Sequence, residues 1–272
     1  MHRQALTVAI AGVMLSAAAC AAPAAPATPA TPTSLPARTV VTVKMGHLDP
    51  PSLGLAPMLI AQEKGYFADQ GVTLEPVGFA NTPDVATPLA APGLSLADVD
   101  LQLMGFPNML PALLNGSIDA GWEIEFFLTQ AIDSGSVVVF KHGEEFVPGA
   151  QLGILALSSQ FASDHDAAAR YLAGWLEGAR LYNDAFGKKD PRARNEVYAI
   201  LKKRIPNMTD ALLDHLAPSG IDPDGKLNLA SLQDQQAFFV ASGSQQQALD
   251  IRELADASFA EDAVKRLGGP YQ

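Results

Sequence analysis

The sequence predicts an α/β fold followed by a mainly helical C-terminal part. Residues 39–77 read as a β-branched segment, an apolar helix and a second β-branched segment, and a similar alternation recurs over residues 100–157. From residue 164 onward, apolar side chains recur at helical spacing instead. Hydrophobic residues make up 48% of the 272 positions, so the chain is long and apolar enough to bury a core.

The chain begins with a segment that has the layout of a signal peptide. Residues 1–19 hold a basic start at Arg3, an apolar run and a group of small residues, and the run is too short for a good membrane span. The only cysteine, Cys20, follows directly, which resembles a lipobox although Ala17 stands where leucine is usual. We expect lipidation at Cys20; the alternative is an ordinary signal peptide followed by an unrelated cysteine.

The next segment predicts a tether between this anchor and a globular body. After the cysteine, residues 21–37 are almost wholly alanine, proline and threonine, a composition that keeps a chain extended, so residues 20–38 form the anchor and tether. The formal charge of −11 argues against nucleic acid as a partner, because a phosphate backbone needs a basic face. We expect a protein held by lipid on the extracytoplasmic side of the cell membrane.

One β-α-β unit is predicted at the start of the globular part. Strands are expected over 39–46 and 72–77, and the helix between them has Pro57 in its first turn and ends at Gly65. Such crossovers are right-handed and give a parallel sheet. The two strands are therefore expected to lie side by side in the same direction.

The connection after the first strand is a candidate binding site. Ligands bind at the carboxyl ends of parallel strands, near the N-terminus of the following helix. Residues 46–57 are therefore the candidate binding site, and we expect His47, Leu48 and Pro57 to contact the ligand. The alternatives are a plain connecting loop and a structural histidine.

A second alternation of strands and helices follows. Strands are expected over 100–104, 118–122, 137–140 and 151–157, and helices over 106–115 and 126–133. The remaining chain predicts helices over 166–186, with Asp164 as N-cap, and over 192–204, 209–217, 229–242 and 258–267.

Aromatic and polar residues follow two of these predicted strands. Phe106 and Asn108 come after the strand at 100–104, although Asn108 also suits a helix cap. Trp122, Glu123 and Glu125 end the strand at 118–122; the indole can stack on a planar ligand, and the carboxylates can accept hydrogen bonds from an amine. The alternative is a core tryptophan with solvated glutamates.

Three motifs, in this order along the chain, resemble one family. Ala-Gln-Glu-Lys-Gly-Tyr-Phe at 61–67, Gly-Ser-Ile-Asp-Ala at 116–120 with Glu125-Phe126 after it, and the segments 221–243 and 256–259 are similar to the solute-binding proteins of ABC transporters. The branch is the one that handles nitrate, sulfonates, taurine and the thiamine pyrimidine precursor. The resemblance covers most of residues 40–270.

The resemblance implies a periplasmic-binding-protein-like (type II) fold of two α/β lobes around a cleft. Residues 39–85 would form part of lobe one, 86–150 part of lobe two, and 151–272 the return to lobe one and the C-terminal helices. The implied protein is a monomer that captures a small solute, works with ABC permease subunits and needs no cofactor.

One departure from the family pattern predicts an incomplete fold. The family's first Gly-x-Ile-Asp segment and its Asp-Leu-x-Gly-Lys strand are missing, and relative to that pattern the chain passes directly from about Asn81 to about Leu89. We interpret this as an internal deletion, which predicts exposed apolar surface and weakened ligand binding. Two complete sheets of about five strands each would remove this hypothesis.

The candidate loops favour one ligand class over another. They hold almost no arginine or lysine, which sulfonate or nitrate would need, whereas aromatic and acidic residues suit a pyrimidine-like heterocycle. The first alternative function is a non-binding remnant or scaffold lipoprotein. The second is an enzyme like the pyrimidine-precursor synthases, which the resemblance disfavours because these carry a cysteine-rich cluster.

Two further patterns contain residues that can bind metal ions, but each is better explained as an ordinary turn or loop. Asp222-x-Asp224-Gly225 starts like a calcium loop, but Gln233 stands where that loop needs its glutamate, so a turn is expected. His142, Glu144 and Glu145 suit a polar surface loop. The sequence therefore predicts no metal site.

Overall fold

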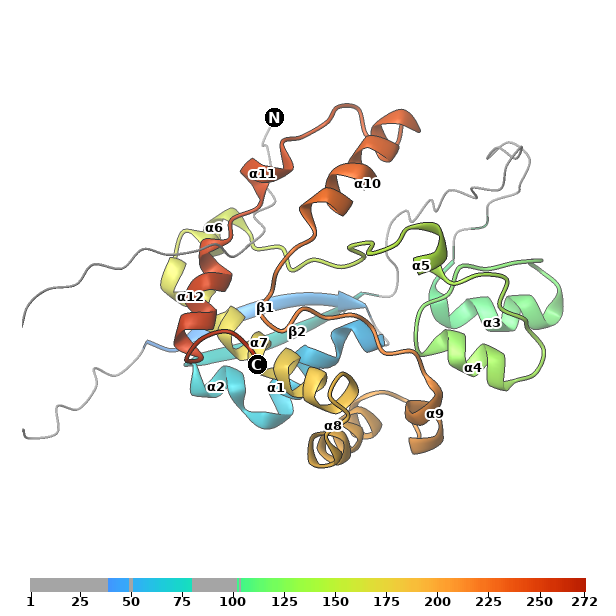
Figure 1. Ribbon diagram of the computed structural model, residues 1–272, viewed down its shortest axis with the longest axis horizontal. Helices are drawn as coiled ribbons and strands as arrows, with labels where there is room; N and C mark the ends of the chain where they lie inside the picture. Colours follow the sequence, from blue (N-terminus) through green and yellow to red (C-terminus); the bar gives the residue numbers. More distant parts are fainter. Residues whose placement is uncertain (1–38, 49–50, 80–101, 103) are drawn as a thin grey trace, which may run out of the picture.

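The computed structural model describes residues 39–48, 51–79, 102 and 104–272 (Figure 1). The predicted signal peptide, Cys20, the tether and the proposed deletion point lie outside these residues. The strands are β1 (Val41–Leu48) and β2 (Val72–Phe79). The helices are η1 (Leu53–Leu55), α1 (Ala56–Lys64), α2 (Tyr66–Asp69), α3 (Phe106–Asn115), α4 (Phe127–Asp133), α5 (Gly143–Phe146), α6 (Ser159–Ala162), α7 (His165–Phe186), α8 (Pro191–Arg204), α9 (Asp210–His215), α10 (Leu229–Ala241), α11 (Ile251–Leu254) and α12 (Ser258–Arg266).

The predicted β-α-β unit is confirmed. β1 and β2 are parallel, with Val43 opposite Leu74, and α1 lies between them in the chain. Gly65 ends α1 at a φ of 77°, a left-handed conformation that glycine adopts without a steric penalty. Its N–H bonds the carbonyl of Ala61, which satisfies one free group at the helix end.

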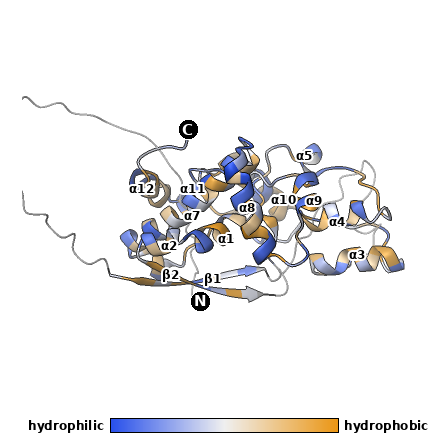
Figure 2. Cartoon of the chain, turned by 90° about the horizontal axis from the view of Figure 1, so that it is seen from below, coloured by the Kyte–Doolittle hydropathy of each residue, from blue (hydrophilic) through white to orange (hydrophobic). Residues whose placement is uncertain are grey.

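The long helix α7 is the centre of the core. It contacts α1, α2, α8 and α12, and these helices lie on one face of the sheet (Figure 2). The predicted N-cap is confirmed, since the Asp164 carboxylate accepts the N–H of Ala167 at 3.0 Å. Gly178 lets α1 and α7 meet backbone to backbone, because a Cβ there would lie 2.1 Å from the carbonyl oxygen of Pro57.

Two arginines on α7 fasten distant segments to the core. The buried Arg170 donates to the carbonyls of Thr39, Gln70 and Gly71, each at 3.1 Å, and so ties both strand starts to the helix. Arg180 forms a second tie, since it pairs with the buried Asp224 at 2.7 Å. The same guanidinium donates to the carbonyl of Gly269 at 2.8 Å.

The strands predicted after residue 100 are wrong where the structure describes them. Residues 118–122 and 137–140 form no strand, residues 102 and 104 are also outside any strand, and Leu157 alone makes a β-bridge within 151–157. The physical reason is that a strand needs a partner edge and a packed face, which an alternating sequence does not supply by itself. The helices predicted at 106–115 and 126–133 do form, as α3 and α4.

The sheet is small, and the described residues cover it on one side only. Val43 and Val72 are buried against the helices, whereas Thr42, Lys44 and Glu75 on the other face are exposed. Parallel sheets usually have both faces covered. The described residues hold one two-stranded sheet, so the two complete sheets that would remove the deletion hypothesis are not seen among them. The two-lobe fold stays a prediction.

Several large apolar side chains lie on the surface. Val138, Phe140 and Leu152 are 94%, 88% and 81% exposed, all within or next to segments predicted as strands. No helix in the described part of the chain is both long and apolar enough to cross a membrane.

Candidate functional site

Residues 122–125, here called the acidic segment, lie just before α4 and contact the connection after β1. The N–H of Leu53 donates to the backbone carbonyl of Glu125 at 3.4 Å, and Leu53 and Phe126 are both buried in the core. The two candidate regions, 46–57 and 122–125, are therefore brought together. The structure achieves this without the strand predicted at 118–122.

The Glu125 carboxylate joins two further elements. One oxygen accepts the hydroxyl of Thr129 in α4 at 2.8 Å, and the other accepts the N–H of Ala217, after α9, at 3.3 Å. A carboxylate has about four acceptor positions, so these two bonds leave capacity for others. Glu125 thus holds α4 against the end of α9.

Glu123 differs from an ordinary surface glutamate. Burial raises its pKa to about 7, the neighbouring charge of Glu125 adds to this rise, and the N–H of Ile124, which donates to the carboxylate at 3.0 Å, opposes it. At neutral pH this carboxyl group is therefore present in both forms, and it can accept or donate a hydrogen bond. Strongly shifted pKa values are typical of functional sites.

Trp122 is half-covered and half-open. Its indole lies against Gly143 at the start of α5, since a Cβ on that glycine would be 2.9 Å from the ring. The residue remains 37% exposed, so part of the indole can still contact a ligand. The sequence offered two interpretations of Trp122, a core residue or a residue that stacks on a ligand. The observed exposure of the side chain is intermediate between these two.

The other predicted contacts lie on β1, α1 and α3. Pro57 is fully buried and packs against α7, so it supports the connection and does not face a ligand. His47 is half-buried near the end of β1, and Leu48 ends that strand. Phe106 begins α3 half-buried; Asn108 is exposed, and its side chain does not cap the helix.

Two open surface hollows lie elsewhere, along the outer side of α7. One has a volume of about 480 Å³ and is lined by Tyr66, Glu177, Arg180 and other residues; the second is about 690 Å³ and borders it at Leu181 and Asp184. Neither includes the acidic segment. The first holds a buried carboxylate oxygen of Glu177 that has no hydrogen-bond partner among the described residues, but the groove is open to water. The segment that holds Glu123 and Glu125 is therefore the better candidate site.

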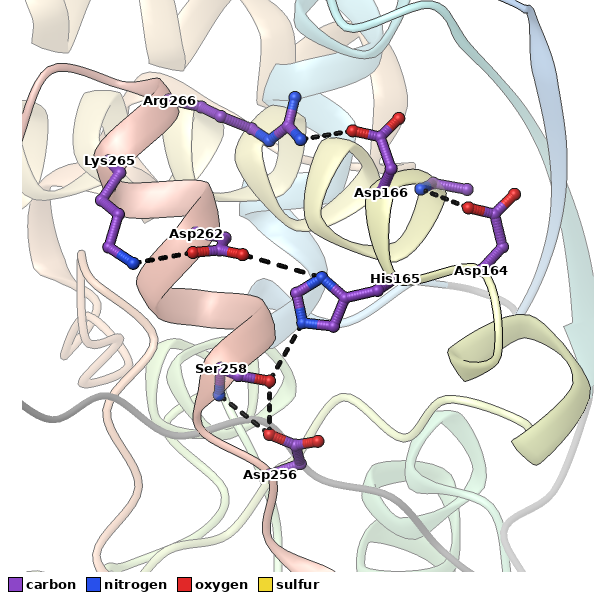
Figure 3. A network of polar contacts seen from close by, with 9 residues as sticks. Asp164, His165, Asp166, Asp256, Ser258, Asp262, Lys265 and Arg266 are labelled. Carbon is purple, nitrogen blue, oxygen red and sulfur yellow. Dashed lines mark hydrogen bonds and ion pairs between the residues drawn. The ribbon is translucent and has the colours of Figure 1, made fainter.

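A cluster of polar residues joins the starts of α7 and α12 (Figure 3). Nε2 of His165 lies 3.0 Å from Oγ of Ser258, and its Nδ1 lies 3.7 Å from the Asp262 carboxylate, which resembles a catalytic triad. However, the Ser258 hydroxyl donates to Asp256 at 2.6 Å, so the histidine is not its proton acceptor. Neither hollow includes His165 or Ser258. The cluster is best explained as a structural link, here called the clip, in which His165 holds α7 against Ser258 and Asp262 of α12.

This clip was not visible in the sequence, because His165 and Ser258 are 93 positions apart. The contact of Glu125 with Ala217 was missed for the same reason. The turn predicted at Asp222 is confirmed, since its carboxylate accepts the N–H groups of Asp224 and Lys226. Within the described residues, no group of three or more histidine, cysteine, aspartate or glutamate residues is arranged to hold a metal ion.

Comparison of the chain with protein-family models, with characterised proteins and with solved structures found no match.

Proposed function

We propose that the protein is the lipid-anchored substrate-binding component of an ABC importer, and that it takes a pyrimidine-like heterocycle in preference to a sulfonate or nitrate. The observation that supports this proposal is the pair of carboxyl groups, Glu123 and Glu125, in a segment whose backbone bonds Leu53 in the connection after β1. Their partners are neutral: the N–H groups of Ile124 and Ala217 and the hydroxyl of Thr129. Among the described residues, no lysine or arginine pairs with either glutamate.

Such a site selects ligands by charge. An anion near Glu125 is repelled and finds no guanidinium or ammonium to bind, whereas an amine or ring N–H can donate to a free carboxylate position. The exposed part of Trp122 offers an apolar surface to a planar ring. A solute with several N–H groups on an aromatic ring therefore fits the residues present.

The raised pKa of Glu123 couples the binding of a ligand to the release of a proton. Since this pKa is about 7, a ligand that donates hydrogen bonds to Glu123 favours the ionised carboxylate and releases a proton near neutral pH. Affinity for such a ligand should then rise as the pH increases from 6 to 8. The lipid at Cys20 and the tether would keep the domain near permease subunits in the membrane.

A second candidate, the non-binding remnant or scaffold lipoprotein, is favoured by a different observation. The described sheet has two strands and one uncovered face, and Val138 and Phe140 are almost fully exposed. A protein that lacks the second lobe would show these features and no cleft. The two candidates differ in whether a ligand stabilises the fold.

A thermal-shift screen of the purified protein tests the proposal. The compounds are an aminopyrimidine, nitrate, taurine and an alkanesulfonate, because a ligand that binds the native state raises Tm by mass action. We expect the aminopyrimidine alone to raise Tm, with a smaller rise in Glu123→Gln and an unchanged rise in Glu253→Gln, an exposed control on α11. A cooperative melt that no compound moves would support the scaffold, and a broad melt the remnant.

A further inference from the structure

The connection between α4 and α5 carries an unusual apolar edge. After Gly135, residues 136–140 read Ser-Val-Val-Val-Phe and form no helix or strand. Val138 is 94% and Phe140 88% exposed, against 37% for Val139 between them. In an extended conformation these two alternate residues would share one side of the segment. The connection lies at the end of the molecule that carries α3 and α4 (Figure 1).

The backbone of this edge is unpaired as well. Within the described residues, no hydrogen bond reaches the N–H or C=O groups of residues 137–140. Three consecutive valines and a phenylalanine have the composition of a β-strand, and a short segment of this kind with no charge and no proline readily adds to another strand. The segment is thus a free strand edge of the kind that native proteins usually protect.

We propose that residues 137–141 pair antiparallel with the same segment of a second copy of the chain. A pairing centred on Val139 is two-fold symmetric, and it places Val138 of each copy directly opposite Phe140 of the other. Cross-strand pairs of an aromatic and a β-branched residue stabilise sheets. Val138 and Phe140, the two most exposed large apolar side chains of the described residues, therefore cover each other in the pair.

Charge does not oppose a second copy at this edge. The chain carries a net charge of −11, so two copies repel each other over most of their surface. Residues 134–143, Ser-Gly-Ser-Val-Val-Val-Phe-Lys-His-Gly, contain no acidic residue. In the proposed register Lys141 lies opposite Val137 and not opposite the second Lys141, so no like charges are brought face to face. This proposal needs no ligand and is independent of the proposed function.

The interface is small, so the dimer is expected to be reversible. Five residues from each copy bury less than about 1,200 Å², which is the range of weak, transient complexes. Sedimentation velocity of the full chain should then show mostly monomer at about 1 µM and a dimer at about 100 µM. This outcome would replace the monomer that the family resemblance implies.

A matched pair of variants locates the contact. Val138→Lys places a charge in the proposed interface, whereas Leu152→Lys makes the same kind of change at another exposed apolar residue, 81% exposed and outside the segment. We expect Val138→Lys to remain monomeric at 100 µM, Leu152→Lys to dimerise like the natural chain, and both to keep its Tm. A chain that is monomeric throughout, a dimer that both variants keep, or open-ended aggregates would overturn the proposal.

A cross-link tests the register itself. In a chain carrying Cys20→Ser, Val139→Cys places two cysteines directly opposite each other, where antiparallel Cα atoms lie about 4.5–5.5 Å apart and a disulfide can form. Val137→Cys places each cysteine opposite Lys141 instead. Rapid oxidation to a covalent dimer with Val139→Cys, and at least tenfold slower oxidation with Val137→Cys, is expected. Equal rates would contradict the register.

Discussion

Replacing Glu123 by glutamine should make the protein more stable at alkaline pH. The pKa of Glu123 is raised from its usual 4.5 to about 7, mainly because burial disfavours the charged carboxylate. The folded state therefore holds a proton that the unfolded state releases near pH 4.5. Stability contributed by the protonated form is complete below pH 4.5 and is lost as the pH rises through 7.

The magnitude follows from the same shift. A rise from 4.5 to about 7 corresponds to at most about 3.4 kcal/mol. Since water reaches part of this carboxyl group, we expect about 1–2 kcal/mol at pH 8. Glutamine has nearly the same shape, carries no charge and can still accept the N–H of Ile124, so it avoids this penalty.

Urea denaturation of the natural chain and of Glu123→Gln at pH 4, 6 and 8 measures the effect. Both proteins should have equal free energies of unfolding at pH 4, and the variant should be more stable by about 1–2 kcal/mol at pH 8. Groups other than Glu123 and its neighbour Glu125 titrate in both proteins alike, so the difference between them reports Glu123 together with its coupling to Glu125. Glu253→Gln, on the surface of α11, serves as control. A difference that is constant with pH, or a variant less stable at pH 8, would refute the reasoning.

Three further substitutions test the contacts that hold the fold. Arg170→Met leaves the carbonyls bound by the buried guanidinium without their donor, so urea denaturation should show a loss of about 3 kcal/mol or more. Gly178→Ala forces α1 and α7 apart and should cost at least about 2 kcal/mol by the same assay, whereas Gly220→Ala, where a Cβ meets no atom within 4 Å, should change stability by less than about 0.5 kcal/mol. Asp224→Ala removes the partner of Arg180 and should lower Tm and speed proteolysis of the C-terminal residues.

The features predicted correctly were those decided within a few residues of sequence. Gly65 ends α1 because the chain needs a left-handed residue there, and Asp164 caps its helix through the nearby N–H group of Ala167. Such signals do not depend on distant parts of the chain. The β-α-β unit was predicted for the same reason.

The strands after residue 100 could not be judged in this way. The segment Val-Val-Val-Phe at 137–140 has a strong strand composition, but whether it forms a strand depends on a partner edge. Local pattern cannot show that the described residues provide no such edge. Val138 and Phe140 therefore remain exposed, and the segment forms no strand with any part of the chain that the structure describes.

The candidate site was predictable in part. Strand-end reasoning selected both the connection after β1 and Glu125, and the bond from Leu53 to Glu125 shows that they meet. The prediction depended on a strand at 118–122, and residues 118–122 form no strand. Both of the regions in contact were therefore selected, but Glu125 was selected for the wrong structural reason. The raised pKa of Glu123 depends on packing in three dimensions, which sequence alone does not give.

The most direct test of solute binding at the acidic segment is calorimetric titration of the purified protein with an aminopyrimidine at pH 7, in two buffers that differ in ionisation enthalpy. Our account predicts saturable binding, and heats that differ between the buffers because Glu123 releases a proton. With Glu123→Gln, the difference between buffers should disappear. Titrations without saturable heat, together with saturable binding of nitrate or a sulfonate, would contradict the account.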